Sequence, residues 1–72
     1  MANPINPAKL LLSKWTAVQP QQREKHFLVT KLLRDEQDHI TGCVLEAALT
    51  QRAQAIDWKL LKDASQWRQG WH

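Results

Sequence analysis

The sequence predicts a single β-rich α+β domain, built as a three- or four-stranded antiparallel meander with short helical turns near its C-terminal end. Three observations support this prediction. The chain has 72 residues, which is enough for one domain. Runs of β-branched and aromatic residues are separated by short polar segments that favour turns. Four tryptophans supply large side chains from which so short a chain can build a core.

The N-terminal segment, residues 1–8, is predicted to be an extended arm ahead of one small domain that spans residues 9–72. Pro4 and Pro7 each follow an asparagine, and such pairs oppose helix and favour turns. Residues 9–18 are predicted to form a first strand, with Trp15 and Ala17 on one face. Pro20 and the glutamines around it break the alternation, so we expect a loop there.

Residues 25–34 are predicted to form a second strand. Phe27, Val29 and Thr30 favour pleated structure, and apolar residues fall on both faces, as in a central strand. The polar run at residues 35–38 lies between two apolar segments. We therefore expect a hairpin loop of about four residues there.

Residues 39–50 fit two structures. As a strand they place one continuous apolar face on Cys43, Leu45, Ala47 and Leu49. As a helix they continue a stripe toward Leu60, and local propensity slightly favours helix over residues 44–61. The strand-like residues 40–44, and residues 50–52, which can close a hairpin, favour the strand. We expect a strand, and residues 44–56 stay open between strand and helix.

The C-terminal segment contains two candidate helix N-caps, Asp57 and Asp63. The first opens a predicted helical turn over residues 58–62. The second opens a predicted turn over residues 64–69, and Gly70 follows as the residue after the helix end.

Charge and cysteine content limit the class of protein. Ten Lys and Arg against seven Asp and Glu give a net charge of +3, which suits an anionic partner without requiring one. Cys43 is the only cysteine, so we expect a small buried side chain in a protein from a reducing compartment. The sequence shows no signal peptide and no membrane span. We expect a cytoplasmic protein that does not bind membranes.

No group of residues matches a known catalytic or metal-binding pattern. The three histidines, His26, His39 and His72, are not spaced with one another or with Cys43 as zinc ligands are. Two glycines are too few for a phosphate-binding loop, and neither serine lies in a nucleophile elbow. We expect no metal, no cofactor and no enzymatic activity.

Several short segments, some of which carry a tryptophan, are spread along nearly the whole chain. They are Asn6-Pro7, Lys9-Leu10-Leu11, Ser13-Lys14-Trp15-Thr16-Ala17-Val18, Glu24-Lys25-His26-Phe27, Cys43-Val44-Leu45-Glu46-Ala47, Asp57-Trp58, and Lys62-Asp63 with Trp67 and Gly70-Trp71. Together these segments resemble a small bacterial family of tryptophan-rich proteins catalogued as a domain of unknown function. The resemblance implies a short, free-standing bacterial protein. It implies no activity.

Two functional hypotheses remain. The first is an accessory protein that binds a protein partner or forms a homodimer through an exposed apolar patch or an unpaired sheet edge. The alternative is a module that binds nucleic acid or another polyanion through basic residues and an exposed indole. We expect all four tryptophans to be mainly structural, with Trp71, next to the C-terminus, as the best candidate for exposure. The candidate surface residues are Lys14, Lys25, His26, Lys59, Arg68 and Trp71.

Overall fold

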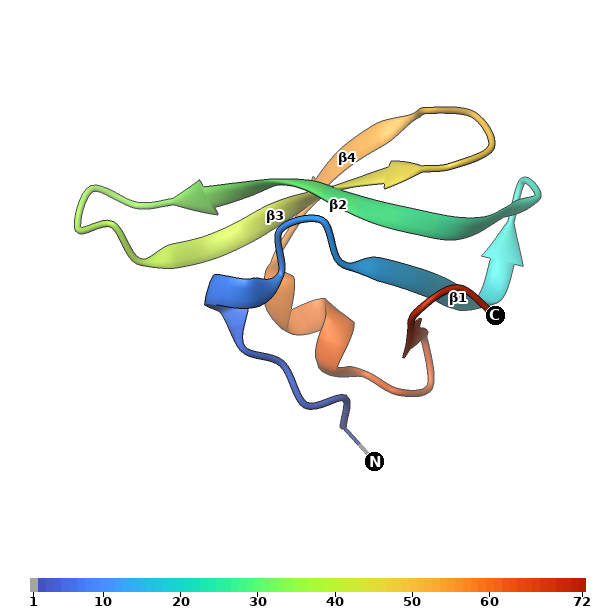
Figure 1. Ribbon diagram of the computed structural model, residues 1–72, viewed down its shortest axis with the longest axis horizontal. Helices are drawn as coiled ribbons and strands as arrows, with labels where there is room; N and C mark the ends of the chain where they lie inside the picture. Colours follow the sequence, from blue (N-terminus) through green and yellow to red (C-terminus); the bar gives the residue numbers. More distant parts are fainter. Residues whose placement is uncertain (1) are drawn as a thin grey trace.

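The computed structural model describes residues 2–72 and is dominated by one antiparallel sheet of five strands in the order β4-β3-β2-β1-β5 (Figure 1). The strands are β1 (Lys14–Gln21), β2 (Glu24–Arg34), β3 (Ile40–Ala47), β4 (Ala53–Ile56) and β5 (Trp67–Gln69). Two short 3₁₀ helices complete the fold, η1 (Pro7–Lys9) and η2 (Trp58–Lys62). The antiparallel, mostly β architecture with few helical turns confirms the predicted class. The prediction of three or four strands was too low by at least one.

The β1–β2 connection explains why the expected loop around Pro20 is absent. β1 continues through Pro20 to Gln21. Its pairing with β2 is irregular between Thr16 and Gln21, and proline, which has no N–H to donate to a neighbouring strand, is tolerated at such irregular positions. Gln22 and Arg23 form the whole turn, both with positive φ (54° and 65°). Two such residues are what a tight hairpin between twisted strands requires.

The start of β1 also differs from the prediction, because the strand begins at Lys14 and not at residue 9. Residues 10–13 form a turn in which the Leu10 carbonyl accepts hydrogen bonds from the Ser13 amide at 2.9 Å and the Ser13 hydroxyl at 2.5 Å. Leu12 adopts a left-handed conformation (φ 66°) within this turn. The apolar run Leu10-Leu11-Leu12 therefore bends where alternation alone suggested an extended chain.

The second and third strands and their hairpin follow the prediction closely. The Asp35 carboxylate accepts hydrogen bonds from the amides of Gln37 and His39, at 2.8 and 2.9 Å, and so shapes the turn. β3 is a strand and not a helix, because alternation buries its apolar side chains on the core face. Leu49 is an exception to the predicted face, because it lies in the following turn and is 69% exposed.

The core lies on one face of the sheet. It consists of Trp15, Phe27, Val29, Cys43, Leu45 and Ala47 from the strands, together with Leu10 and Leu61. Leu10 follows η1 and Leu61 belongs to η2. In Figure 1 both helices and the N-terminal segment lie on the same side of the sheet, below it. The opposite face carries no helix from residues 2–72, so we call it the outer face.

The C-terminal segment contains one helical turn instead of the two predicted. Asp57 caps η2 by accepting a hydrogen bond from the Lys59 amide at 2.9 Å, as expected. Asp63 instead forms a tight turn with Ser65, and the chain then extends into β5. Trp67 pairs with β1 and packs edge-on against Phe27, with ring centroids 5.2 Å apart. This tertiary contact outweighs the weak local preference for a second helical turn.

The N-terminal segment was expected to be extended. It instead contains η1 and is hydrogen-bonded to the rest of the domain. Pro7 begins η1 because proline fits the first position of a helix, where its missing N–H is not needed, and Asn6 caps it. The Asn3 side chain donates hydrogen bonds to the carbonyls of Leu61 and Trp67, both at 2.8 Å. These bonds join the segment to η2 and β5. No helix among residues 2–72 combines the length and apolar character needed to cross a membrane.

Replacing Gly42 by alanine is expected to destabilise the protein. A Cβ atom at Gly42 would lie 2.5 Å from the main-chain oxygen of Ile56 on β4, so β4 would have to move. We expect the Gly42→Ala variant to lose about 1–3 kcal/mol of unfolding free energy, as overpacked sites do. Chemical denaturation followed by tryptophan fluorescence measures this loss. The neighbouring exposed Thr41→Ala should unfold close to the parent, and an equally stable Gly42→Ala would contradict the packing.

Candidate functional site

The outer face carries an aromatic and basic cluster centred on Trp71. The indole Nε1 donates a hydrogen bond to the Phe27 carbonyl at 3.0 Å. The Lys14 ammonium lies over the ring, 4.8 Å from its centroid, and the His26 ring lies 5.6 Å away, tilted by 32°. At 44% exposure, Trp71 is the most exposed of the four indoles. Trp71 was the tryptophan expected to be the best candidate for exposure.

The chain end is held over β1 and β2 by a short hydrogen-bond network. Gly70 has φ 82°, a conformation that glycine adopts without strain and that turns the chain after β5. The buried Thr16 hydroxyl donates to the Gly70 carbonyl at 2.7 Å and accepts from the His72 amide at 3.0 Å. His26 Nε2 lies 2.8 Å from the His72 carbonyl. These contacts fix Trp71 in place.

Four of the six predicted surface residues share this region. Lys14 and Trp71 are in contact, His26 adjoins the same ring, and Arg68 lies opposite Thr16 on β5, in line with His26 on β2. Lys25 is separated from this region because successive side chains of a strand point to opposite faces. Lys59 belongs to η2, on the covered side of the sheet.

The other tryptophans serve the core, as predicted. Trp15 is 1% exposed, and its Nε1 donates to the Ser13 hydroxyl at 2.9 Å. Trp58 and Trp67 are half-buried against the core cluster. The Trp58 Nε1 donates to the Ile40 carbonyl at 3.1 Å, which ties η2 to β3.

The two edges of the sheet differ in how their main-chain groups are satisfied. At the β5 edge, the Trp67 carbonyl accepts from the Asn3 side chain and the Trp67 amide donates to the Asp63 carbonyl at 3.0 Å. The Gln69 carbonyl lies 2.7 Å from His72 Nε2. The N-terminal segment and the chain end therefore cap this edge.

The β4 edge is open. The Ala47 amide donates to the Arg52 carbonyl at 2.9 Å, and hydrogen-bonded pairs alternate along an antiparallel ladder. The pairs Leu45–Gln54 and Cys43–Ile56 are then the hydrogen-bonded ones. The main-chain groups of Ala53 and Ala55 therefore point away from β3. Residues 53–55 are exposed, and β4 contains no charged residue and no proline. Sequence analysis did not identify this edge, although its uncharged run after a turn was visible.

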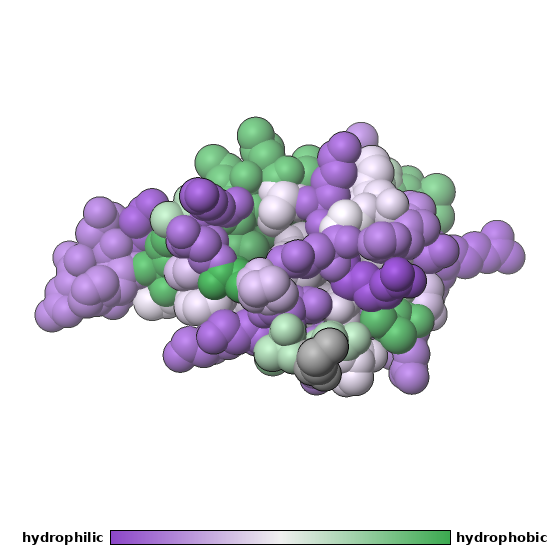
Figure 2. Space-filling view, turned by 60° about the horizontal axis from the view of Figure 1, so that its bottom comes forward, coloured by the Kyte–Doolittle hydropathy of each residue, from purple (hydrophilic) through white to green (hydrophobic). Residues whose placement is uncertain are grey.

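Exposed apolar side chains occur at several separate places. They are Leu11, Leu12, Val18, Leu49, Leu60 and Trp71. Figure 2 shows hydrophobic groups at separated positions on the face that it presents, while the tip of the β2–β3 hairpin at its left is hydrophilic. The hairpin tip contains Asp35, Glu36, Gln37 and Asp38, all exposed. This tip is a solvated loop.

An ion pair between a buried carboxylate and the exposed Arg52, which sequence analysis missed, anchors the residue before β4. The Glu24 side chain is 4% exposed, and Arg52 contacts it through two guanidinium nitrogens. The Thr50 hydroxyl donates to the same carboxylate. The hydrogen bonds from Arg52, and then from Thr50, hold the pKa of Glu24 below its usual value. The carboxyl therefore stays ionised and engaged at neutral pH.

Cys43 is a packing residue. It is fully buried, and its burial, with a smaller contribution from the Asp57 carboxylate, raises the pKa of the thiol to about 11. A thiol in this state is a poor nucleophile and metal ligand at neutral pH. Among residues 2–72, no three His, Cys, Asp or Glu side chains are grouped closely enough to hold a metal ion.

Glu24→Gln is expected to weaken the acid dependence of stability. A carboxyl whose pKa is lowered by folding stabilises the folded state above its unfolded pKa, and this contribution is lost as the pH falls through the lowered value. The variant should be less stable at neutral pH and should lose less stability on acidification. The pKa of Asp63 is also lowered, by hydrogen bonds from Ser65, so some acid dependence should remain.

Denaturant midpoints measured from neutral to strongly acidic pH test this prediction. Glu36→Gln, at the exposed hairpin tip, is the matched control and should follow the parent. Parallel curves for Glu24→Gln and the parent would mean that the ion pair does not contribute to acid sensitivity.

The comparisons with known proteins identify a family without assigning a function. The family model described as "Tryptophan-rich protein (DUF2389)" matches residues 13–72. The match includes all five strands, η2 and all four tryptophans, and leaves out η1. No curated protein and no solved structure matches the chain.

Proposed function

Because this chain belongs to the tryptophan-rich protein family DUF2389, whose function is unknown, we propose from its geometry that it is a non-enzymatic accessory protein that binds another protein chain. The bound chain adds an extended strand to the open β4 edge. The single observation that carries this proposal is the contrast between the capped β5 edge and the uncapped β4 edge.

Exposed sheet edges usually carry features that prevent pairing with other chains. Lysine, proline, bulges and covering segments are the common ones, and an edge without them is a template for strand addition. β4 has none of these in its four residues, Ala53-Gln54-Ala55-Ile56. The small side chains of Ala53 and Ala55 leave room for an incoming strand on the outer face. The Glu24–Arg52 pair fixes the chain at the start of this edge.

The chemistry of the described residues supports a binding role over a catalytic one. The Glu24 carboxylate is occupied by Arg52 and Thr50, and Cys43 is buried with a raised pKa. A single cysteine suits a reducing compartment, so the proposal places the protein and its partner in the cytoplasm.

Binding of an anionic polymer such as nucleic acid is the second candidate function. The Trp71 cluster supports it, because an exposed indole with Lys14, His26 and Arg68 nearby is the combination that single-strand binders use. The cluster also weakens this candidate. Lys14 and His26 already pack on the Trp71 ring, so a stacking base would have to displace at least one of them.

Site-specific photo-crosslinking in cells tests strand addition at β4. A photo-reactive amino acid placed at Ala55 is expected to give discrete adducts whose masses identify the partner, including a second copy of the chain. The same amino acid at Arg68, on the capped β5 edge, is the matched control. Ala53→Pro removes an outward-pointing donor, is tolerated at the first residue of an edge strand, and should abolish the adducts. Equal adducts from Ala55 and Arg68, or adducts that survive in folded Ala53→Pro, would refute the proposal.

Titration with mixed-sequence single-stranded RNA tests the second candidate through intrinsic tryptophan fluorescence. Binding should quench the emission, weaken as salt is raised, and weaken further in Lys14→Gln. Lys25→Gln, which removes an equal charge from the opposite face of β2, should have the smaller effect. Unchanged fluorescence at low salt would eliminate this candidate and leave Trp71 as a packing residue.

A further inference from the structure

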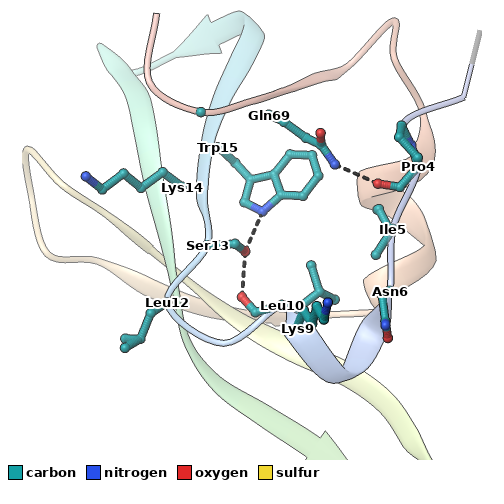
Figure 3. Close-up of a pocket in the computed structure, with 11 residues that line it drawn as sticks. Pro4, Ile5, Asn6, Lys9, Leu10, Leu12, Ser13, Lys14, Trp15 and Gln69 are labelled. Atoms are coloured by element: carbon teal, nitrogen blue, oxygen red, sulfur yellow. Dashed lines mark hydrogen bonds between the residues drawn. The ribbon is translucent and has the colours of Figure 1, made fainter.

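A cleft of about 480 Å³ opens between the N-terminal segment and the start of β1 (Figure 3). Its volume lies in the range of small-molecule binding sites. It is separate from the β4 edge, because β3 and β2 lie between β4 and β1 in the sheet. Neither the predicted surface residues as a group nor the proposed strand addition accounts for it.

The inside of the cleft is apolar. Trp15 and Leu10 lie at its base but are only 1% and 3% exposed, so the apolar surface open to a ligand is mainly that of Pro4, Ile5 and Leu12. Figure 3 shows the Trp15 indole facing Pro4 and Ile5 across the opening, with Leu10 below. Apolar ligand surface placed here would be removed from water against these side chains, which is the main source of affinity in such sites.

The polar groups at the cleft are already paired with one another. The Ser13 hydroxyl donates to the Leu10 carbonyl and accepts from Trp15 Nε1. The Gln69 amide donates to the Pro4 carbonyl at 2.7 Å, and the Asn6 side chain accepts from the Ala8 amide at 3.1 Å. The hydroxyl and the indole N–H at the base of the cleft are therefore occupied, which leaves the side chains at the rim as its main polar recognition groups.

The charge at the rim has one sign. Lys9 and Lys14 line the cleft, and no aspartate or glutamate does. Within residues 2–72, neither lysine forms an ion pair, although the Lys14 ammonium contacts Trp71. Lys9 is therefore the principal cation available to a bound anion, and the rim favours a negatively charged group.

The rim is also apolar at a strained position. Leu12 is 66% exposed. Its backbone is left-handed (φ 66°), a conformation that residues other than glycine rarely adopt. Its amide donates to the Val29 carbonyl at 2.8 Å, which fixes the turn. The neighbouring Leu11 is 49% exposed and extends the apolar surface.

We propose that this cleft binds a small amphipathic anion, whose apolar body packs on Pro4, Ile5 and Leu12 above the buried Trp15 and whose single carboxylate lies near Lys9. A medium-chain fatty carboxylate has this chemistry. The proposal does not depend on the β4 edge, and either can fail without the other.

Decanoate, used below its critical micelle concentration, is the probe. Calorimetry should detect saturable binding of decanoate by the full chain, and weaker binding of decanol and decylammonium. Amide and indole resonances should shift at residues 5–15, including the Trp15 indole N–H, and not at β4. Lys9→Gln should weaken decanoate binding about two- to fivefold, as expected for loss of one exposed charge pair, and leave decanol binding unchanged. Lys59→Gln is the matched control and should behave as the parent.

A second pair of variants places a carboxylate on each of two exposed leucines. Leu12→Glu, at the rim, should abolish decanoate binding, whereas Leu60→Glu, on η2, should retain it. Absence of decanoate binding to the folded parent, resonance shifts away from residues 5–15, equal binding of decylammonium, or equal losses in Leu12→Glu and Leu60→Glu would each overturn the proposal.

Discussion

The rest of the structure depends on the pairing of Trp15 with Phe27 across β1 and β2. Trp15 is almost fully buried and donates to Ser13, which in turn donates to Leu10, so one indole fixes the turn that precedes its own strand. Phe27 packs against Trp67, which brings β5 to the sheet, and its carbonyl accepts from Trp71. Three of the four indoles are thus arranged around one cross-strand pair. In so short a chain, this pair supplies much of what a larger core would provide.

Because the core lies on one face of the sheet, the two faces and the two edges of the sheet are covered to different degrees. The N-terminal segment and η2 cover the core face and cap the β5 edge through Asn3. On the outer face, residues 70–72 cover part of β1 and β2, and the β4 edge receives no covering element from residues 2–72. The β5 edge is therefore capped, whereas the β4 edge, at the other end of the sheet, is open. This asymmetry is the physical basis of the strand-addition proposal.

Lys14 links two of the surfaces described above. Its ammonium lies over Trp71 on the outer face, and the same residue lines the cleft beside Trp15. Because that ammonium is engaged by the indole, the charge offered to a ligand of the cleft is mainly that of Lys9. The β4 edge is separated from β1 by two strands, β3 and β2, and lies apart from both surfaces.

The sequence by itself determined the features that depend on neighbouring residues. The strand at residues 25–34, the Asp35 turn and the Asp57 cap follow from β propensity, from a side chain that accepts local amides, and from capping. The alternation of Cys43, Leu45 and Ala47 likewise indicated a strand. The grouping of Lys14, His26 and Trp71 was foreseen only as a set of candidates, without their contacts.

Only the tertiary structure decided the remaining features, because they arise from residues far apart in the chain. Residues 67–69 became a strand since Trp67 packs on Phe27, forty residues earlier, and local capping by Asp63 could not reveal this contact. The Glu24–Arg52 pair joins residues 28 positions apart. Whether β4 lies at an open edge depends on the strand order, and the cleft exists only where the N-terminal segment folds back toward β1. Propensity and patterning act over a few residues, whereas the faces, edges and hollows of a sheet are set by which distant segments meet.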